Sequence, residues 1–229
     1  MHRLTTPTTK ALFAASAGLI LSAASAATAF AQCVGEASYE VTFMPNWVEG
    51  VTSYDVPSNA HWSPMVVATH ASLGDIFSIG DQSTRGVQTV AETGGRGPIT
   101  AELDALFDAG TVRAYRTGSL INDAVGSNTV TLSAAPAQPY LTMISMIAPS
   151  PDWFVGVDGV ALCQGSAWVD DLQLPLMAQD AGTDSGVAFA SPNAPTLPKA
   201  AIQYLDPDLN LTSVAQEAAV FGTLSIKRN

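Results

Sequence analysis

Residues 149–186, which read PSPDWFVGVDGVALCQGSAWVDDLQLPLMAQDAGTDSG, decide the fold. They contain a proline-flanked turn with a carboxylate at Asp152, then apolar runs of strand length, and then a polar loop at 180–186. Short apolar runs bounded by Gly, Pro, Asn and Asp are typical of antiparallel strands. The loop is too rich in glycine and carboxylate to belong to a core, and its oxygens suit a cation.

Further strand-like segments lie on both sides of this stretch. They are 39–43, 65–70, 76–79, 112–115, 128–132, 140–147, 155–157, 159–162, 167–174 and 220–226. Residues 100–107 differ, because their apolar residues follow helical spacing behind Thr100 as a possible N-cap. No repeat or domain linker is visible. We therefore predict one all-β domain, an antiparallel β-sandwich with one short helix.

The N-terminal segment has the pattern of a secretory signal peptide. Two basic residues precede an apolar run at 11–24, which leads to a small-residue A-x-A motif without any acidic residue. The run is short for a membrane span, so a retained anchor is the less favoured alternative, as is lipid attachment at Cys33. We expect a signal peptide at 1–31 and an exported domain at 32–229.

The exported part is strongly acidic. The chain has 9 Lys and Arg and 20 Asp and Glu, and two of the bases lie in the signal segment, which leaves a formal charge of about −13. Nucleic-acid binding requires concentrated Lys and Arg, so a nucleic-acid partner is disfavoured. An anionic membrane is disfavoured too, unless a divalent cation bridges the surfaces. Solubility alone is the simplest explanation of the charge.

Two cysteines, Cys33 and Cys163, remain in the exported part. An oxidising compartment and an even count favour a single disulfide. It would close a loop of roughly 130 residues and stabilise the fold by about 3–5 kcal/mol in the chain-entropy model. Two free buried thiols are the alternative.

Catalytic templates fit poorly. The exported part has two histidines, His61 and His70, with Ser63 and Ser72 near them in sequence, but no G-x-S-x-G, H-E-x-x-H or phosphate-binding glycine motif. Zinc-site spacing is also missing. We expect no enzyme. The alternative is a secreted hydrolase of glycans or other cell-envelope substrates. Such an enzyme would use two catalytic carboxylates, and the sequence does not indicate which two Asp or Glu residues these would be.

Hard oxygen ligands are plentiful, and calcium binds six to eight of them in irregular geometry. Asp180 and Asp184 lie in a glycine-containing D-x-x-x-D loop that suits such an ion, with Asp152 supplied from the neighbouring turn. From the residues alone, turn formation by Asp180 and Asp184 is the simpler role. The four tryptophans, 47, 62, 153 and 168, could form a carbohydrate platform, but burial in a core is favoured.

Five segments together resemble the spondin N-terminal domain. They are YEVTFMPNW (39–47), NAHWSP (59–64), GVQTVAE (86–92), PSPDWFVGVDGVALC (149–163) and DAGTDSGVAFASPNAPTLP (180–198). The resemblance implies an antiparallel β-sandwich similar to a C2 domain, with calcium held by loops at one end. It implies that Asp152, Asp180 and Asp184 are the calcium ligands. The chain departs from the pattern at Gln179, where relatives carry a tryptophan, and it lacks a cysteine that relatives often have after Cys163.

The residues and the resemblance together lead to one functional expectation. We expect a secreted, single-domain bacterial member of this family, located in the periplasm or outside the cell and without a transmembrane anchor in the mature chain. It would bind Ca²⁺ and act as a non-enzymatic binding or adhesion module. Its partner would be an extracellular protein or glycan that the sequence does not identify.

Overall fold

The structure, a computed structural model, describes residues 33–49, 56–205 and 220–229. The predicted signal peptide lies outside these residues. In chain order the described elements are β1 (Ala37–Pro45), β2 (His61–Trp62), β3 (Val66–His70), α1 (Arg85–Thr93), α2 (Gly97–Asp108), β4 (Val112–Thr117), β5 (Asn128–Ala134), β6 (Tyr140–Ala148), β7 (Trp153–Ala161), β8 (Cys163–Gln164), β9 (Ala167–Trp168), β10 (Asp171–Asp180), β11 (Gln203–Tyr204) and β12 (Val220–Arg228).

The long strands pair in the continuous order β4-β3-β6-β7-β10-β12-β1-β5, and every pair is antiparallel. Strand β10 joins two halves of this sheet: its first part pairs with β12, and its last three residues pair with β7. The register with β12 shifts between Leu176 and Met177, and the change of partner follows at Ala178. The all-β prediction is therefore confirmed, whereas the two-layer, C2-like sandwich stays a prediction.

The outer strands β4 and β5 come close to each other, so the sheet nearly closes on itself. The Thr69 hydroxyl, from β3, donates to the Ser133 carbonyl of β5 at 2.7 Å. The Gln138 amide donates to the Gly110 carbonyl at 2.8 Å, which ties the loop after β5 to the start of β4. These bonds hold β3, β4 and β5 together at the place where no ladder between β4 and β5 is described.

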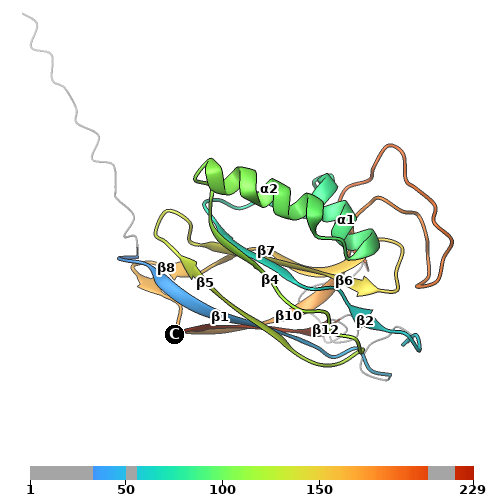
Figure 1. Cartoon of the computed structure of the whole chain (residues 1–229), viewed down its shortest axis with the longest axis horizontal. Coiled ribbons are helices and arrows are strands. Elements are labelled where there is room, and N and C mark those ends of the chain that lie inside the picture. The colour runs from blue at the N-terminus through green and yellow to red at the C-terminus, as the bar shows by residue number, and fades with distance from the viewer. Residues whose placement is uncertain (1–32, 50–55, 206–219) are drawn as a thin grey trace, which may run out of the picture. The chain divides into compact units, whose positions relative to one another are not determined.

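Two apolar cores explain why β6 is buried along almost its whole length. Met143 and Val155 belong to the core enclosed by the two halves of the sheet. Ile144 and Phe154, the adjacent residues, belong to a second core beneath the helices. Successive side chains of a strand point to opposite faces, so β6 and β7 contribute to both cores. Figure 1 shows both helices on the outer side of the strands β4, β6 and β7.

The expectation of one helix was incomplete, because two helices are present. Helix α1 begins behind Thr84, whose hydroxyl accepts a bond from the Val87 amide at 3.1 Å, and it ends at Gly94 with φ 65°. Helix α2 begins at Gly97, so Thr100 lies inside it and is not its N-cap. The carboxylate of Glu102 accepts bonds from the Gly86 amide and the Thr84 hydroxyl, both at 2.8 Å, which fastens α2 to the first turn of α1.

Most predicted strands are confirmed, but residues 76–79 form no strand. Ile76 and Phe77 are instead buried in the core beneath the helices, which accounts for their apolar character. The tryptophans are also confirmed as core residues: the side chains at 47, 62, 153 and 168 are all buried. In the part of the chain that the structure describes, no helix has the length and apolarity to span a bilayer.

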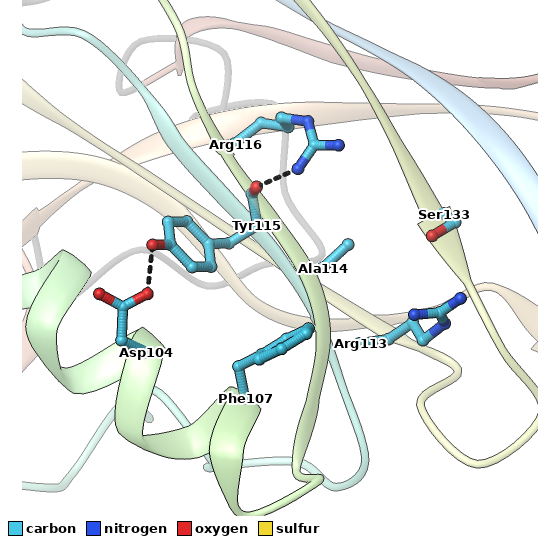
Figure 2. A pocket seen from close by; sticks show the side chains of 7 residues that line it. All are labelled: Asp104, Phe107, Arg113, Ala114, Tyr115, Arg116 and Ser133. Atoms are coloured by element: carbon cyan, nitrogen blue, oxygen red, sulfur yellow. Dashed lines mark hydrogen bonds between the residues drawn. The ribbon is translucent and has the colours of Figure 1, made fainter.

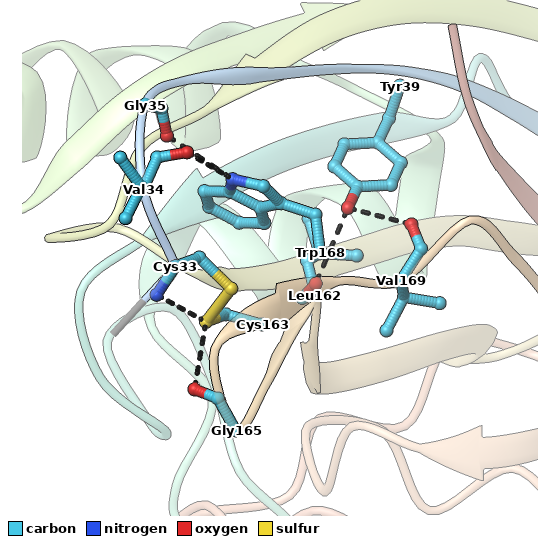
Figure 3. The surroundings of a disulfide bond; sticks show 9 residues. All are labelled: Cys33, Val34, Gly35, Tyr39, Leu162, Cys163, Gly165, Trp168 and Val169. Carbon is cyan, nitrogen blue, oxygen red and sulfur yellow. Dashed lines mark hydrogen bonds between the residues drawn. A yellow bond between two sulfur atoms is a disulfide. The ribbon is translucent and has the colours of Figure 1, made fainter. Parts of the chain in front are cut away.

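The predicted disulfide between Cys33 and Cys163 is confirmed, and it spans 130 residues of sequence. Figure 3 shows the indole of Trp168 beside it, donating to the Val34 and Gly35 carbonyls at 3.3 and 3.2 Å. The phenol of Tyr39 donates nearby to the Val169 carbonyl at 3.0 Å. The bridge thus fastens the start of β1 to the hairpin of β8 and β9.

Candidate functional site

Strand pairing brings two of the predicted ligands together. Asp152 immediately precedes β7, and Asp180 is the last residue of β10. In the ladder between these strands Asp180 lies opposite Trp153. Asp152 and Asp180 are therefore neighbours across the sheet although they are 28 positions apart in sequence.

Asp152 is completely buried, and only one of its carboxylate oxygens has hydrogen-bond partners. Its Oδ2 accepts bonds from the backbone amides of Thr183 at 2.7 Å and Asp184 at 2.9 Å, and from the Thr183 hydroxyl at 3.2 Å. Its Oδ1 is buried without a partner. Burial raises the pKa of Asp152, the Thr183 and Asp184 bonds oppose this rise, and the negative charge of Asp184 adds to it.

Asp180 is partly exposed, and its environment disfavours the charged carboxylate. Burial, followed by repulsion from Asp152 and more weakly from Asp184, raises the pKa of Asp180 to about 6. A bond from the Gly182 amide to Oδ1 at 2.7 Å acts in the opposite direction. The Trp153 indole lies close enough to lower the pKa slightly, yet its N–H meets no acceptor with hydrogen-bond geometry.

Asp184 organises the loop through both carboxylate oxygens. Oδ1 accepts a bond from the Gly186 amide at 2.8 Å, and Oδ2 accepts one from the Ala194 amide at 2.9 Å. Its charge is felt by both other aspartates. Each carboxylate oxygen keeps a second lone pair, so these bonds leave acceptor capacity at Asp184.

The loop is more buried than its composition suggests: Ala181, Thr183 and Asp184 are all buried. The expectation that the loop lies outside the core is therefore wrong. The proline-containing segment 194–200 runs beside the loop, and backbone bonds link the two, including the Thr196 amide to the Thr183 carbonyl at 2.9 Å. Because the backbone groups are paired in this way, a polar loop can be buried at low cost.

Gln179, the departure from the family pattern, immediately precedes Asp180 in β10 and lies opposite Phe154 of β7. It is buried, and its side-chain amide donates to the Gly156 carbonyl at 2.9 Å. Its Oε1 has no hydrogen-bond partner. The sequence shows that glutamine replaces tryptophan at position 179. It does not show that the Gln179 side chain adds a second unpaired oxygen to that of Asp152.

The three aspartates fit calcium in chemistry but do not yet form a compact ligand cluster. Carboxylate and amide oxygens are the donors that calcium prefers, and two of them, at Asp152 and Gln179, are unpaired. Among the described residues, however, no group of three or more His, Cys, Asp or Glu side chains converges closely enough to hold a metal ion. Calcium binding therefore stays a prediction.

A surface pocket of about 290 Å³ gives access to this site. It is lined by Trp153, Asp180, Gly186, Val187 and Leu205. Of the three aspartates, Asp180 is the one that lines this pocket.

The two histidines of the described residues have different surroundings. His61 Nδ1 pairs with the Asn59 carbonyl at 2.8 Å. His70 is fully buried between the Ser72 carbonyl and the Thr142 hydroxyl, each at 2.8 Å, with a carboxylate oxygen of Asp75 at 3.5 Å. This arrangement has the residue types of a hydrolytic triad, but Thr142 is buried as well, so a substrate does not reach it.

Comparison with known proteins supports the resemblance to the spondin N-terminal domain. The family model described as Spondin_N matches residues 37–218. Spondin-2 of Rattus norvegicus is 31% identical over 167 residues, which cover 71% of this chain and 51% of that protein. Spondin-1 of Mus musculus is 33% identical over 181 residues, which cover 75% of this chain and 22% of that protein.

The chain therefore spans about half of the length of spondin-2 and about a fifth of spondin-1. The family match covers most of the chain, including β1, both helices and the aspartate loop. The chain belongs to the spondin N-terminal domain family.

Proposed function

We propose that the protein is a secreted, calcium-binding, non-enzymatic binding module that acts outside the cell or in the periplasm. The observation that supports this proposal most is the Oδ1 atom of Asp152, which is buried without a hydrogen-bond partner. The neighbouring carboxyl of Asp180 has a pKa raised to about 6. A buried carboxylate oxygen without a partner is costly unless a proton or a cation satisfies it. Family membership supports the same role.

In this proposal Asp152, Asp180 and Asp184 hold the calcium ion. The ion would supply positive charge to three carboxylates that otherwise repel one another. Asp152 Oδ2 fixes the position of the loop by accepting a bond from the Thr183 amide. Asp184 does the same by accepting bonds from the Gly186 and Ala194 amides. Small shifts of the Asp180 and Asp184 side chains would complete the site, since each has further acceptor capacity.

The proposed role of the ion is to fasten the end of the domain at which β7 and β10 meet. There the two halves of the sheet are joined by a ladder of only three residue pairs, at 178–180. We also propose that the two halves of the sheet form the two layers of a C2-like sandwich. The partner would be an extracellular protein or glycan that binds to the scaffold so stabilised.

The test is thermal unfolding of the domain, residues 32–229, with calcium and with a chelator. Calcium should raise the melting temperature of the wild type and leave an Asp180→Asn/Asp184→Asn variant unchanged. Asp171→Asn is the matched control, because Asp171 is exposed and lies at the opposite end of the same strand. A wild-type melting curve that does not respond to the chelator would contradict the proposal.

A further inference from the structure

A second pocket, of about 510 Å³, lies where the nearly closed sheet has its seam. It is lined by Asp104 and Phe107 of α2, by Arg113, Ala114, Tyr115 and Arg116 of β4, and by Ser133 of β5. Figure 2 shows both guanidinium groups on the side of β4 that faces β5, with Ser133 across from them. Its volume is in the range of sites that hold small molecules.

Two of the seven basic residues of the exported domain meet in this pocket. Arg116 is exposed, and the one bond described for its side chain runs from Nη1 to the Tyr115 carbonyl at 2.7 Å. Most of its donors therefore face solvent without a carboxylate. Arg113 pairs with Glu36 at 2.7 Å, but the two side chains are 39% and 54% exposed. Such a surface pair contributes little and exchanges readily for another carboxylate.

The rest of the pocket offers an aromatic ring and oxygen acceptors. Phe107 is 50% exposed although it is a large apolar residue. The Tyr115 hydroxyl donates to Asp104 Oδ1, which leaves Asp104 Oδ2 free to accept a hydroxyl group. Guanidinium donors, a half-exposed aromatic ring and a carboxylate acceptor thus line one cavity.

We infer that this pocket binds a uronate residue of an acidic glycan. The planar guanidinium of Arg116 matches the sugar carboxylate in a bidentate pair. The negative face of the Phe107 ring matches the polarised C–H groups of the pyranose, and Asp104 accepts from its hydroxyls. An acidic peptide offers the carboxylate but neither the C–H face nor vicinal hydroxyls. The inference rests on the binding role proposed above and is independent of calcium.

The experiment is an NMR titration of the labelled domain with cellobiouronic acid, and in parallel with cellobiose, which has a primary alcohol in place of the carboxylate. Cellobiouronic acid should shift the Nε–H signal of Arg116 and the amides of β4, and cellobiose should bind at least tenfold more weakly. Arg116→Gln should weaken binding about tenfold, because a charge-assisted bond is lost. Arg116→Lys should recover only part of it. Arg85→Gln, which removes the same charge from an exposed position on α1, should change the affinity less than twofold.

Equal binding of the acid and the neutral sugar would overturn the inference, as would binding that Arg116→Gln leaves unchanged. Binding of a glutamate-rich hexapeptide in preference to the sugar would overturn it in favour of a peptide site. Each titration is repeated in chelator and in calcium. If the sugar does not bind but calcium still raises the melting temperature, only this inference is contradicted. If the sugar binds but calcium does not change the melting temperature, only the calcium site is contradicted.

Discussion

In calcium-free protein, Asp180→Asn should stabilise the fold above pH 6. The pKa of Asp180 rises on folding from an ordinary value of 3.8 to about 6, because folding buries the carboxyl and places it beside Asp152. Below pH 3.8 the carboxyl is protonated in both states. As the pH rises through about 6, the folded state must ionise an unfavourably placed group, so stability is lost across this window. Asparagine resembles the protonated carboxyl and avoids the loss.

The size of the effect follows from the shift. A rise from 3.8 to about 6 corresponds to about 3 kcal/mol. Because Asp180 is partly exposed, solvent screening reduces this, and we expect about 1–2 kcal/mol at pH 7. Calcium should reverse the order of the two proteins, since an ion at 100 times its Kd stabilises the wild type by about 2.7 kcal/mol and the variant loses that contribution.

The assay is urea denaturation of both proteins from pH 4 to 7.5, in chelator and in calcium. The difference between the two free energies of unfolding isolates Asp180 together with its repulsion of Asp152 and Asp184, because titrating groups outside this site contribute equally to both. Asp171→Asn is again the control and should follow the wild type. If Asp180→Asn is less stable than the wild type in chelator at pH 7, the electrostatic account of this site is wrong.

Three further predictions concern the scaffold. Replacing Cys33 and Cys163 by alanine should cost about 3–5 kcal/mol of unfolding free energy, measured in urea, because a 130-residue loop is no longer closed. Gly182→Ala should cost more than about 1 kcal/mol and weaken calcium binding in calorimetry, because Gly182 has φ 72° and a Cβ would lie 2.4 Å from the Ala200 carbonyl oxygen. Burial lowers the pKa of His70, so its ring should titrate below pH 6.5 by NMR. The stability that the neutral ring contributes should be lost as the pH falls below 6.5. A normal titration of His70 would show that the ring is solvated.

The strands were predictable wherever one face of a segment is polar. Strand β1 alternates between buried and exposed residues along Ala37–Pro45, so its period of two is visible in the sequence. Helix α1 was not predicted although its signals are local, because Thr84 caps its start, Gly94 ends it, and its four buried residues follow helical spacing. The apolar run at 76–79 predicts a strand wrongly, because a short apolar run has the same sequence pattern in a strand and in a buried loop.

At the aspartate site, the sequence identified the carboxylates but not their unequal environments. Their number and the glycines between them are local properties, so they could be found without a fold. That Asp152 has one satisfied oxygen and one unpaired oxygen depends on Thr183, 31 residues away, and on the depth of burial. Repulsion between Asp152 and Asp180 likewise exists only because β7 pairs with β10.

The sequence by itself determined the strand-rich class and the family and favoured a single disulfide, because composition, period and cysteine count are properties of the chain, whereas the structure shows that Cys33 and Cys163 pair. Only the tertiary structure decided where the sheet has its seam, and so that Arg113 and Arg116 meet Phe107 and Ser133 in one pocket. The physical reason is that strand order and helix packing decide which residues, distant in sequence, lie close together in space. Burial and charge act only between residues that are close together.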